Sequence, residues 1–182
     1  TGTGKSHVLV HLGAQAIKAG KTVIHYTFEL GDSIIANRYD SCITGTPLSD
    51  LYVFKEQILE EVQKLKGRLI VKEYPTKSVS TVALRSHLEK MKSRDIDVGC
   101  IIVDYADLIK PKRFSSEKRH DLESIYEDLR AIAQEFKCPV WTASQTNRSG
   151  YNAEIVTMES ISEAFNKCFV ADFIFTLSRT ME

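Results

Sequence analysis

The chain begins with the stretch TGTGKSH, residues 1–7, which ends in the order Gly4, Lys5, Ser6, His7. A phosphate-binding loop has the pattern Gly, four variable residues, Gly-Lys and then Ser or Thr, and it leads into a helix. The stretch supplies the second half of this pattern, and the first glycine would precede Thr1. Backbone N–H groups in such a turn, with the positive end of the following helix, bind phosphate. The opening stretch therefore predicts a site for a nucleoside triphosphate.

Each part of this loop has an expected role. We expect Lys5 to contact the β- and γ-phosphates and the Ser6 hydroxyl to bind Mg²⁺. Nucleotide contacts are expected along the whole stretch, at Thr1, Gly2, Thr3, Gly4, Lys5, Ser6 and His7. The alternative interpretation is a flexible end, rich in glycine and threonine, that precedes an ordinary helix.

The composition indicates one soluble domain. Of the 182 residues, 43% are hydrophobic and 26% are charged, and this length is sufficient for a hydrophobic core. No apolar run is long enough to cross a bilayer, so no membrane partner is expected. The four cysteines lie far apart, which indicates reduced thiols and a cytoplasmic location. Because the formal net charge is zero, nucleic-acid binding would have to depend on local basic patches.

Strand-like and helix-like stretches alternate along the chain. Short runs rich in apolar and β-branched residues predict strands over 22–28, 68–74, 100–105, 139–144 and 172–177. Helices are predicted over 7–20, 32–45, roughly 48–66, from an N-cap at Ser80, and over 119–136. This alternation predicts an α/β fold with a mostly parallel sheet flanked by helices. We expect residues 1–182 to form one nucleotide-binding core that lacks its N-terminal strand and its C-terminal strands.

Polar residues follow the predicted strands, where ligands bind in folds of this class. Asp104 ends the apolar run CIIVDY, the place of an aspartate that holds Mg²⁺, although a turn or cap residue would look the same. Glu29 follows TVIHYTF and is a candidate for activating the attacking water. Asp107 is a rival for that role, and a solvated carboxylate at a strand end is the plain alternative for Glu29.

Two further segments carry polar and basic residues. Gln145 lies in ASQTNR, where its amide could sense the γ-phosphate, and Arg148 begins a polar segment that we expect to be a mobile loop. An ordinary turn is the alternative. The segment KPKRFSSEKRH, over 110–120, is strongly basic. A solvated surface loop is the usual explanation of such a run.

Taken in order, TGTGKS, FEL, IIVDY, ASQTNR and ADFIFTLSR resemble the ATPase domain of DnaB-type replicative helicases, a family within the RecA-like P-loop ATPases. The resemblance extends over nearly the whole chain. It implies that Lys5 and Ser6 are the Walker A residues and Asp104 the Walker B aspartate, with ATP and Mg²⁺ as cofactors. It also implies that Glu29 activates water and that Gln145 links the nucleotide state to the DNA-binding loops. Lys5, Glu29 and Gln145 are therefore the expected catalytic residues.

The resemblance also implies partners. In this family six subunits form a ring around single-stranded DNA, and two loops of each subunit line the channel. Here these loops would be about 110–120 and about 147–158, with DNA contacts from Lys112, Arg113, Lys118, Arg119 and Arg148. Salt-dependent binding without sequence preference would suit such basic loops. Primase and a helicase loader are further expected partners.

The sequence also departs from the family pattern. Asp107 stands where the family often has Gln, and Ser162 where it has Arg. The basic residues that family members send into a neighbouring active site would lie beyond Glu182. A RecA- or KaiC-like ATPase that gates assembly on DNA or a protein, without unwinding, is the alternative function. A small-molecule kinase would leave SQTNR and the basic segment unexplained.

Overall fold

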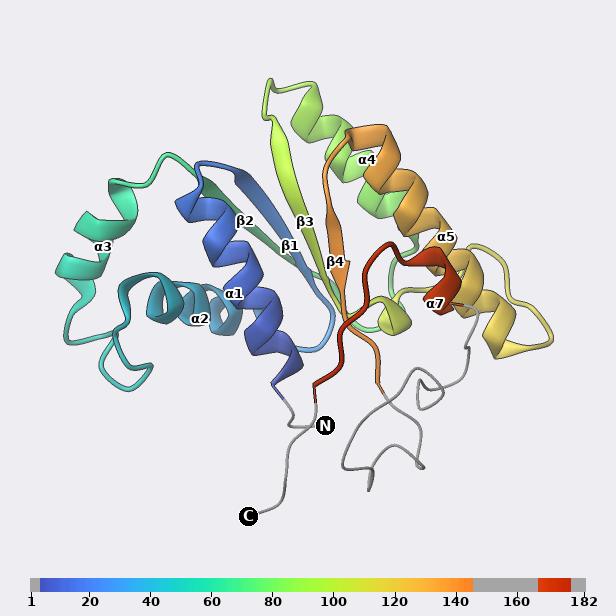
Figure 1. Cartoon of the computed structure of the whole chain (residues 1–182), viewed down its shortest axis with the longest axis horizontal. Helices are drawn as coiled ribbons and strands as arrows, with labels where there is room; N and C mark the ends of the chain where they lie inside the picture. Colours follow the sequence, from blue (N-terminus) through green and yellow to red (C-terminus); the bar gives the residue numbers. More distant parts are fainter. Residues whose placement is uncertain (1–3, 146–166, 178–182) are drawn as a thin grey trace, which may run out of the picture.

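A parallel sheet of four strands organises the chain in the computed structural model, which describes residues 4–145 and 167–177 (Figure 1). The strands are β1 (Thr22–Thr27), β2 (Arg68–Glu73), β3 (Val98–Asp104) and β4 (Val140–Thr142), in the spatial order β2-β1-β3-β4. All three pairings are parallel. Every described strand therefore ends at the same edge of the sheet, and the predicted α/β fold is confirmed.

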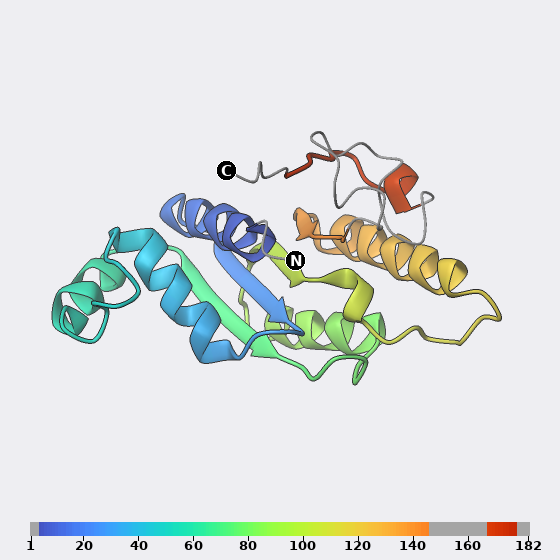
Figure 2. The same ribbon diagram turned by 90° about the horizontal axis from the view of Figure 1, so that it is seen from below.

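Helices cover both faces of this sheet, as Figures 1 and 2 show. Two of them, α1 (Lys5–Lys18) and α2 (Asp32–Thr44), pack on one face, and α4 (Thr81–Lys92) and α5 (Lys118–Phe136) pack on the other. The other helices of the described residues are α3 (Lys55–Gln63), the 3-10 turn η1 (Ala106–Leu108) and the short α7 (Lys167–Val170). Within the described residues, none of these helices is long and apolar enough to cross a membrane.

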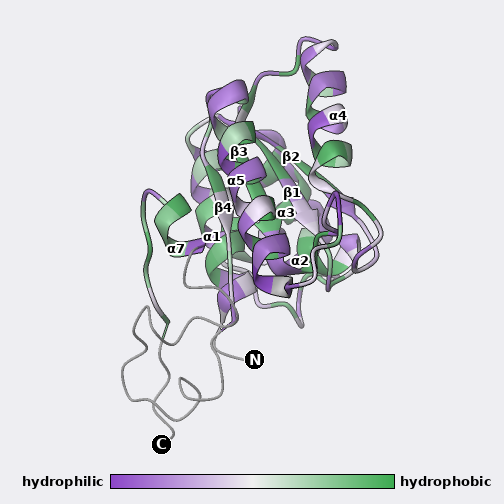
Figure 3. Cartoon of the chain, turned by 90° about the vertical axis from the view of Figure 1, so that its right-hand side faces the viewer, coloured by the Kyte–Doolittle hydropathy of each residue, from purple (hydrophilic) through white to green (hydrophobic). Residues whose placement is uncertain are grey.

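The alternation of side chains along β1 divides the core into two clusters. Ile24 and Tyr26 pack with the apolar residues of α4 and α5. Val23, on the opposite face, packs with α1 and α2. Successive side chains of a strand point to opposite faces. A strand covered on both faces therefore needs apolar residues on both, as in the nearly continuous apolar run of β3. Figure 3 shows mainly hydrophilic residues on the outward side of α5, away from the sheet.

Two predicted elements differ from the structure. Helix α3 begins only at Lys55, because residues 47–54 form turns, with the Asp50 N–H bonded to the Pro47 carbonyl at 2.9 Å. The predicted strand over 172–177 is wrong. These residues are irregular and pair with none of the described strands. Phe173 is 69% exposed. An apolar run indicates a tendency to be buried, but a strand also needs a partner edge.

Candidate nucleotide and metal site

The ends of β1 and β3 bring two acidic residues to one edge of the sheet. Thr27, the last residue of β1, is the register partner of Asp104, the last residue of β3. The Phe28 N–H continues the ladder by donating to the Asp104 carbonyl at 3.0 Å. Glu29 follows directly. The structure therefore places Glu29 and Asp104 side by side at the carboxyl end of the sheet.

The first turn of α1 lies at the same edge. Gly4 is the N-cap of α1 and has a φ of 92°, a left-handed conformation that glycine adopts without strain. Two residues later, the Ser6 side chain lies near enough to Asp104 to lower the pKa of this carboxyl through hydrogen bonding. The structure thus brings the end of the phosphate-binding motif to Asp104. Thr1, Gly2 and Thr3 lie outside the described residues.

Close packing of α1 on its neighbours makes this approach possible. A Cβ atom added at Gly13 would lie 2.1 Å from the Tyr39 hydroxyl and 2.8 Å from Ile102 Cδ1. Tyr39 belongs to α2 and Ile102 to β3. The absence of a side chain at this position in the middle of α1 lets both elements come close to the helix. The start of α1 is thereby held against the end of β3.

The Asp104 carboxyl is buried in a mixed electrostatic environment. The residue is 2% exposed. Burial raises the pKa of Asp104, and the neighbouring Glu29 charge raises it further, whereas the Ser6 hydrogen bond and the charges of Arg38 and Lys5 lower it. Among the described residues, its Oδ2 atom has no hydrogen-bond partner although it is buried. A cation beside this oxygen would favour the ionised carboxyl.

The donor set at this point fits Mg²⁺. Ser6 and Asp104 offer a hydroxyl and a carboxylate oxygen, the ligand type that Mg²⁺ prefers. Within residues 4–145 and 167–177, no group of three or more His, Cys, Asp or Glu residues could hold a metal ion. This is compatible with Mg²⁺ because that ion is usually held by one or two protein ligands together with water and substrate phosphates.

Arg38 is a site residue that the sequence reasoning missed. It lies on α2, the helix that follows Glu29, and its positive charge lowers the pKa of Asp104. Ile35 and Tyr39, on the same helix, are buried against the sheet. The sequence does show a basic residue on the first helix after the Glu29 strand. Whether its side chain comes near Asp104 depends on how α2 packs.

Gln145 reaches the same edge from β4. Its Nε2 atom donates a hydrogen bond to the Tyr105 hydroxyl at 2.8 Å. Tyr105 directly follows Asp104, and β4 is the neighbour of β3. The pKa of Tyr105 is raised, first by burial and then by the nearby Glu29 charge. The structure therefore brings Glu29, Asp104 and Gln145 to the ends of three adjacent strands.

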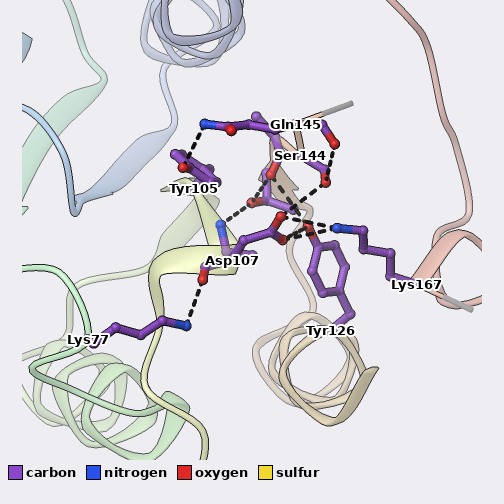
Figure 4. A network of polar contacts seen from close by, with 10 residues as sticks. Lys77, Tyr105, Asp107, Tyr126, Ser144, Gln145 and Lys167 are labelled. Carbon is purple, nitrogen blue, oxygen red and sulfur yellow. Dashed lines mark hydrogen bonds and ion pairs between the residues drawn. The ribbon is translucent and has the colours of Figure 1, made fainter. Parts of the chain in front are cut away.

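Asp107, the rival of Glu29, has a different environment (Figure 4). Its carboxylate accepts hydrogen bonds from the Tyr126 hydroxyl at 2.8 Å and from Ser144 Oγ at 3.2 Å. The Lys167 ammonium pairs with it at 3.1 Å. Both oxygens of Asp107 are thus engaged by other side chains.

In the basic segment over 110–120, two of the basic side chains form ion pairs with nearby carboxylates. Lys112 pairs with Asp128 at 2.6 Å, and Arg119 pairs with Glu117 at 2.5 Å. Arg113 is exposed, and Phe114 beside it is 77% exposed. Lys118 is the first residue of α5. Arg148 and the second predicted DNA-binding loop lie outside the described residues.

Comparison with known proteins shows the family to which the chain belongs. The model of the DnaB-like helicase C-terminal domain matches residues 1–155. The chain belongs to this DnaB-like helicase family. It is similar to a DnaB-like replicative helicase of Enterobacteria phage T4, with 31% identity over 98% of the chain and 40% of the phage protein. It is also similar to the replicative DNA helicase DnaB of Helicobacter pylori (strain J99), with 24% identity over 83% of the chain and 32% of that protein.

Solved structures support the fold of this DnaB-like domain. A structure described as that of a DnaB-like replicative helicase and its interactions with primase superposes with a TM-score of 0.80 at 14% identity, covering 94% of the chain and 44% of the solved one. A structure described as that of an ATPase domain superposes with a TM-score of 0.79, also at 14% identity, covering 94% of the chain and 64% of the solved one. The chain thus spans well under half the length of the curated relatives named above.

Proposed function

We propose that this DnaB-like domain binds and hydrolyses ATP and that the free energy drives movement along single-stranded DNA as part of a hexameric ring. The convergence of Ser6, Glu29 and Asp104 at one edge of the sheet supports this proposal most strongly. These residues come from a helix start and two strand ends that are far apart in the sequence. A solvated strand-end carboxylate would not need the buried Asp104 beside it.

The residues of the chain divide the chemistry as follows. Lys5 neutralises charge on the β- and γ-phosphates, and residues 1–7 surround the phosphates with backbone N–H groups. Ser6 and Asp104 would hold Mg²⁺, which offsets phosphate charge when it is bound. Glu29 orients the attacking water and accepts its proton, because it lies at the same edge and its rival Asp107 is engaged elsewhere.

Arg38 and Gln145 complete the proposed site. Arg38 adds a positive charge on the α2 side, where it counters the two carboxylates and the charge that develops on the phosphate. Gln145 contacts Tyr105, next to Asp104, and leads into the segment that contains Arg148. A change at the γ-phosphate would therefore reach that segment through Gln145.

The basic segment provides the first DNA contact. Arg113 and Phe114 are exposed and adjacent, so a phosphate and an unstacked base could bind there together. Lys112 and Arg119 would have to exchange an internal carboxylate for a phosphate. Lys118 and Arg148 are proposed as further contacts. Such contacts do not read base sequence, which suits a translocating motor.

The partners follow from the family. One matching structure is described with its interactions with primase, and we propose primase and a helicase loader as partners of the full-length protein. The alternative is a RecA- or KaiC-like ATPase that uses the nucleotide to gate assembly without unwinding. The same strand-end residues would serve that function.

The deciding experiment uses the full-length protein. ATP hydrolysis is measured with and without single-stranded DNA, and strand separation is measured on a forked duplex. Stimulation together with unwinding is expected. Stimulation without unwinding would select the assembly-gating alternative.

A Lys5→Ala variant should lose ATP binding, and unchanged affinity for ATP would contradict the phosphate site itself. The matched control is Lys18→Ala, at the exposed end of the same helix.

A further inference from the structure

An ionic cluster lies beside the proposed catalytic edge and takes no part in the chemistry described above (Figure 4). Its centre is the pair of Asp107 and Lys167. The Lys167 ammonium lies 3.1 Å from Asp107 Oδ2 and 3.3 Å from Oδ1. The Lys167 side chain is 2% exposed and that of Asp107 is 17% exposed. Burying a lysine is costly unless it is paired and hydrogen-bonded, so this pair fixes where its two segments meet.

Two hydroxyl groups complete the cluster. Tyr126 of α5 donates to Asp107 Oδ1 at 2.8 Å, and Ser144 donates to Oδ2 at 3.2 Å. Burial raises the pKa of Tyr126 well above its ordinary value, so the hydroxyl keeps its proton and acts as the donor. The Lys167 ammonium also lies 5.5 Å from the centre of the Tyr126 ring. The Asp107 carboxylate therefore joins η1, α5, the end of β4 and the start of α7.

The position of these groups in the sequence shows which parts of the chain the cluster connects. Ser144 directly precedes Gln145, the last residue described before the gap, and Lys167 is the first described after it. Asp107 therefore binds the chain on both sides of residues 146–166. It also lies three residues after Asp104. Gln145 is held from the other side by Tyr105 at 2.8 Å.

We propose that Asp107 is a positioning residue that couples DNA binding to ATP hydrolysis by holding Ser144, and through it Gln145, in register with Lys167. This inference depends on the proposed function, because it assigns a role in coupling the two activities. A displacement of Lys167 shifts the carboxylate that holds Ser144. The amide of Gln145 then moves relative to Tyr105 and the Asp104 edge.

The test measures ATP hydrolysis by the full-length protein with and without oligothymidylate. The stimulation factor is the ratio of the two rates. Asp107→Asn and Lys167→Met each leave a buried charge without its partner, and each is expected to lower the melting temperature by about 10 °C. Each is also expected to lower the stimulation factor about fivefold or more, the lower part of the range for coupling between sites.

The double variant Asp107→Asn/Lys167→Met separates positioning from stability. It contains no unpaired buried charge, so its melting temperature should recover toward that of the wild type. The stimulation factor should stay low because Ser144 and Lys167 are no longer joined through one carboxylate. Recovery of both quantities together would show that the pair only stabilises the fold, and would overturn the inference.

A matched control lies on the same segment. Asp172 is 83% exposed at its side chain and pairs with Arg130 of α5 at 2.8 Å. Asp172→Asn therefore loosens residues 167–177 without touching Asp107, and wild-type stimulation is expected. Equal loss in this control would also overturn the inference. If the wild type itself shows no stimulation, the proposed function fails and the inference falls with it. If the wild type is stimulated and the Asp107 and Lys167 variants keep the full stimulation, the inference alone fails.

Discussion

On the side of β1 and β3, Glu29 and Asp104 lie at the ends of strands that are paired over six positions, from Thr22 with Val98 to Thr27 with Asp104. On the side of β4, the pairing covers only three positions, from Ile101 with Val140 to Val103 with Thr142. Beyond this short ladder, side chains hold the elements together. The Thr142 hydroxyl accepts from the Ala106 N–H at 3.0 Å and donates to the Val103 carbonyl at 2.9 Å.

This difference separates two mechanical roles. A backbone ladder fixes the distance between neighbouring strands, so we expect the strand ends that lead to Glu29 and Asp104 to keep their relation when a ligand binds. Side-chain bonds such as those of Asp107 and Lys167 can exchange partners. We therefore expect the proposed catalytic side to stay constant and the side of the proposed DNA contacts to be the one that rearranges.

The largest effect is expected at Glu29, on the side of β1 and β3. Glu29→Gln should lower the turnover rate for ATP by about 10²- to 10⁴-fold, the usual contribution of a positioned base, while ATP still binds. Steady-state ATPase assays and equilibrium nucleotide binding measure the two quantities. The control is Glu73→Gln, since Glu73 ends the neighbouring β2 and accepts the Asp32 N–H at 3.0 Å. Near-normal turnover of Glu29→Gln would end the assignment.

The free energy of unfolding should depend on pH through His25, a buried residue of β1. Burial lowers the pKa of His25 to about 4. This value lies below the unfolded value of about 6.5. The contribution of neutral, buried His25 to the free energy of unfolding should therefore be complete above pH 6.5. It should fall by about 3 kcal/mol as the pH drops from 6.5 to 4.

Urea unfolding at a series of pH values measures this change. His25→Leu should flatten the profile over that range even if the variant is less stable throughout. His120→Gln, at an exposed histidine, should keep the wild-type slope. A profile for His25→Leu that is as steep as that of the wild type would assign the slope to other groups.

A smaller effect is expected where α1 packs against α2 and β3. Gly13→Ala places a methyl group 2.1 Å from the Tyr39 hydroxyl, and such overpacking costs about 1–3 kcal/mol of unfolding free energy. Calorimetry should also show weaker ATP binding, because the start of α1 moves away from Asp104. Gln15→Ala, on the exposed side of the helix, is the control. A Gly13→Ala variant as stable as the wild type would show that the helix can shift without cost.

The smallest effect is expected for DNA binding by the basic segment over 110–120. Arg113→Ala should weaken binding of single-stranded DNA about two- to fivefold and flatten the salt dependence by about 0.7 in slope. Lys112→Ala should weaken binding less, because the Lys112 ammonium must first leave Asp128. Fluorescence anisotropy at several salt concentrations, with the exposed Lys90→Ala as control, would measure both. A larger loss for Lys112 than for Arg113 would reverse this order.

The sequence was sufficient to predict the fold and the residues at the strand ends. Apolar runs followed by Glu29, Asp104 and Gln145 indicate buried parallel strands, and the carboxyl ends of such strands meet at one edge. Which charges neutralise one another was not predictable in this way. The partner of Asp107 lies 60 residues further along the chain. Arg38 comes near enough to lower the pKa of Asp104 because of the way α2 packs on the sheet. The run over 172–177 has the composition of a strand but no partner edge in the described fold.

The contact of Asp128 with α4 has a consequence for how Asp128 would release Lys112 of the basic segment. Asp128 also accepts a hydrogen bond from Thr81 at 2.6 Å, and Thr81 is the first residue of α4. The dipole of a helix favours a negative charge at its amino end. When Lys112 turns to a phosphate, the carboxylate left behind keeps a donor and a favourable field. Losing the Lys112 pair therefore costs less than it would at a carboxylate without this support, although it still lowers the contribution that we expect from Lys112 to DNA binding.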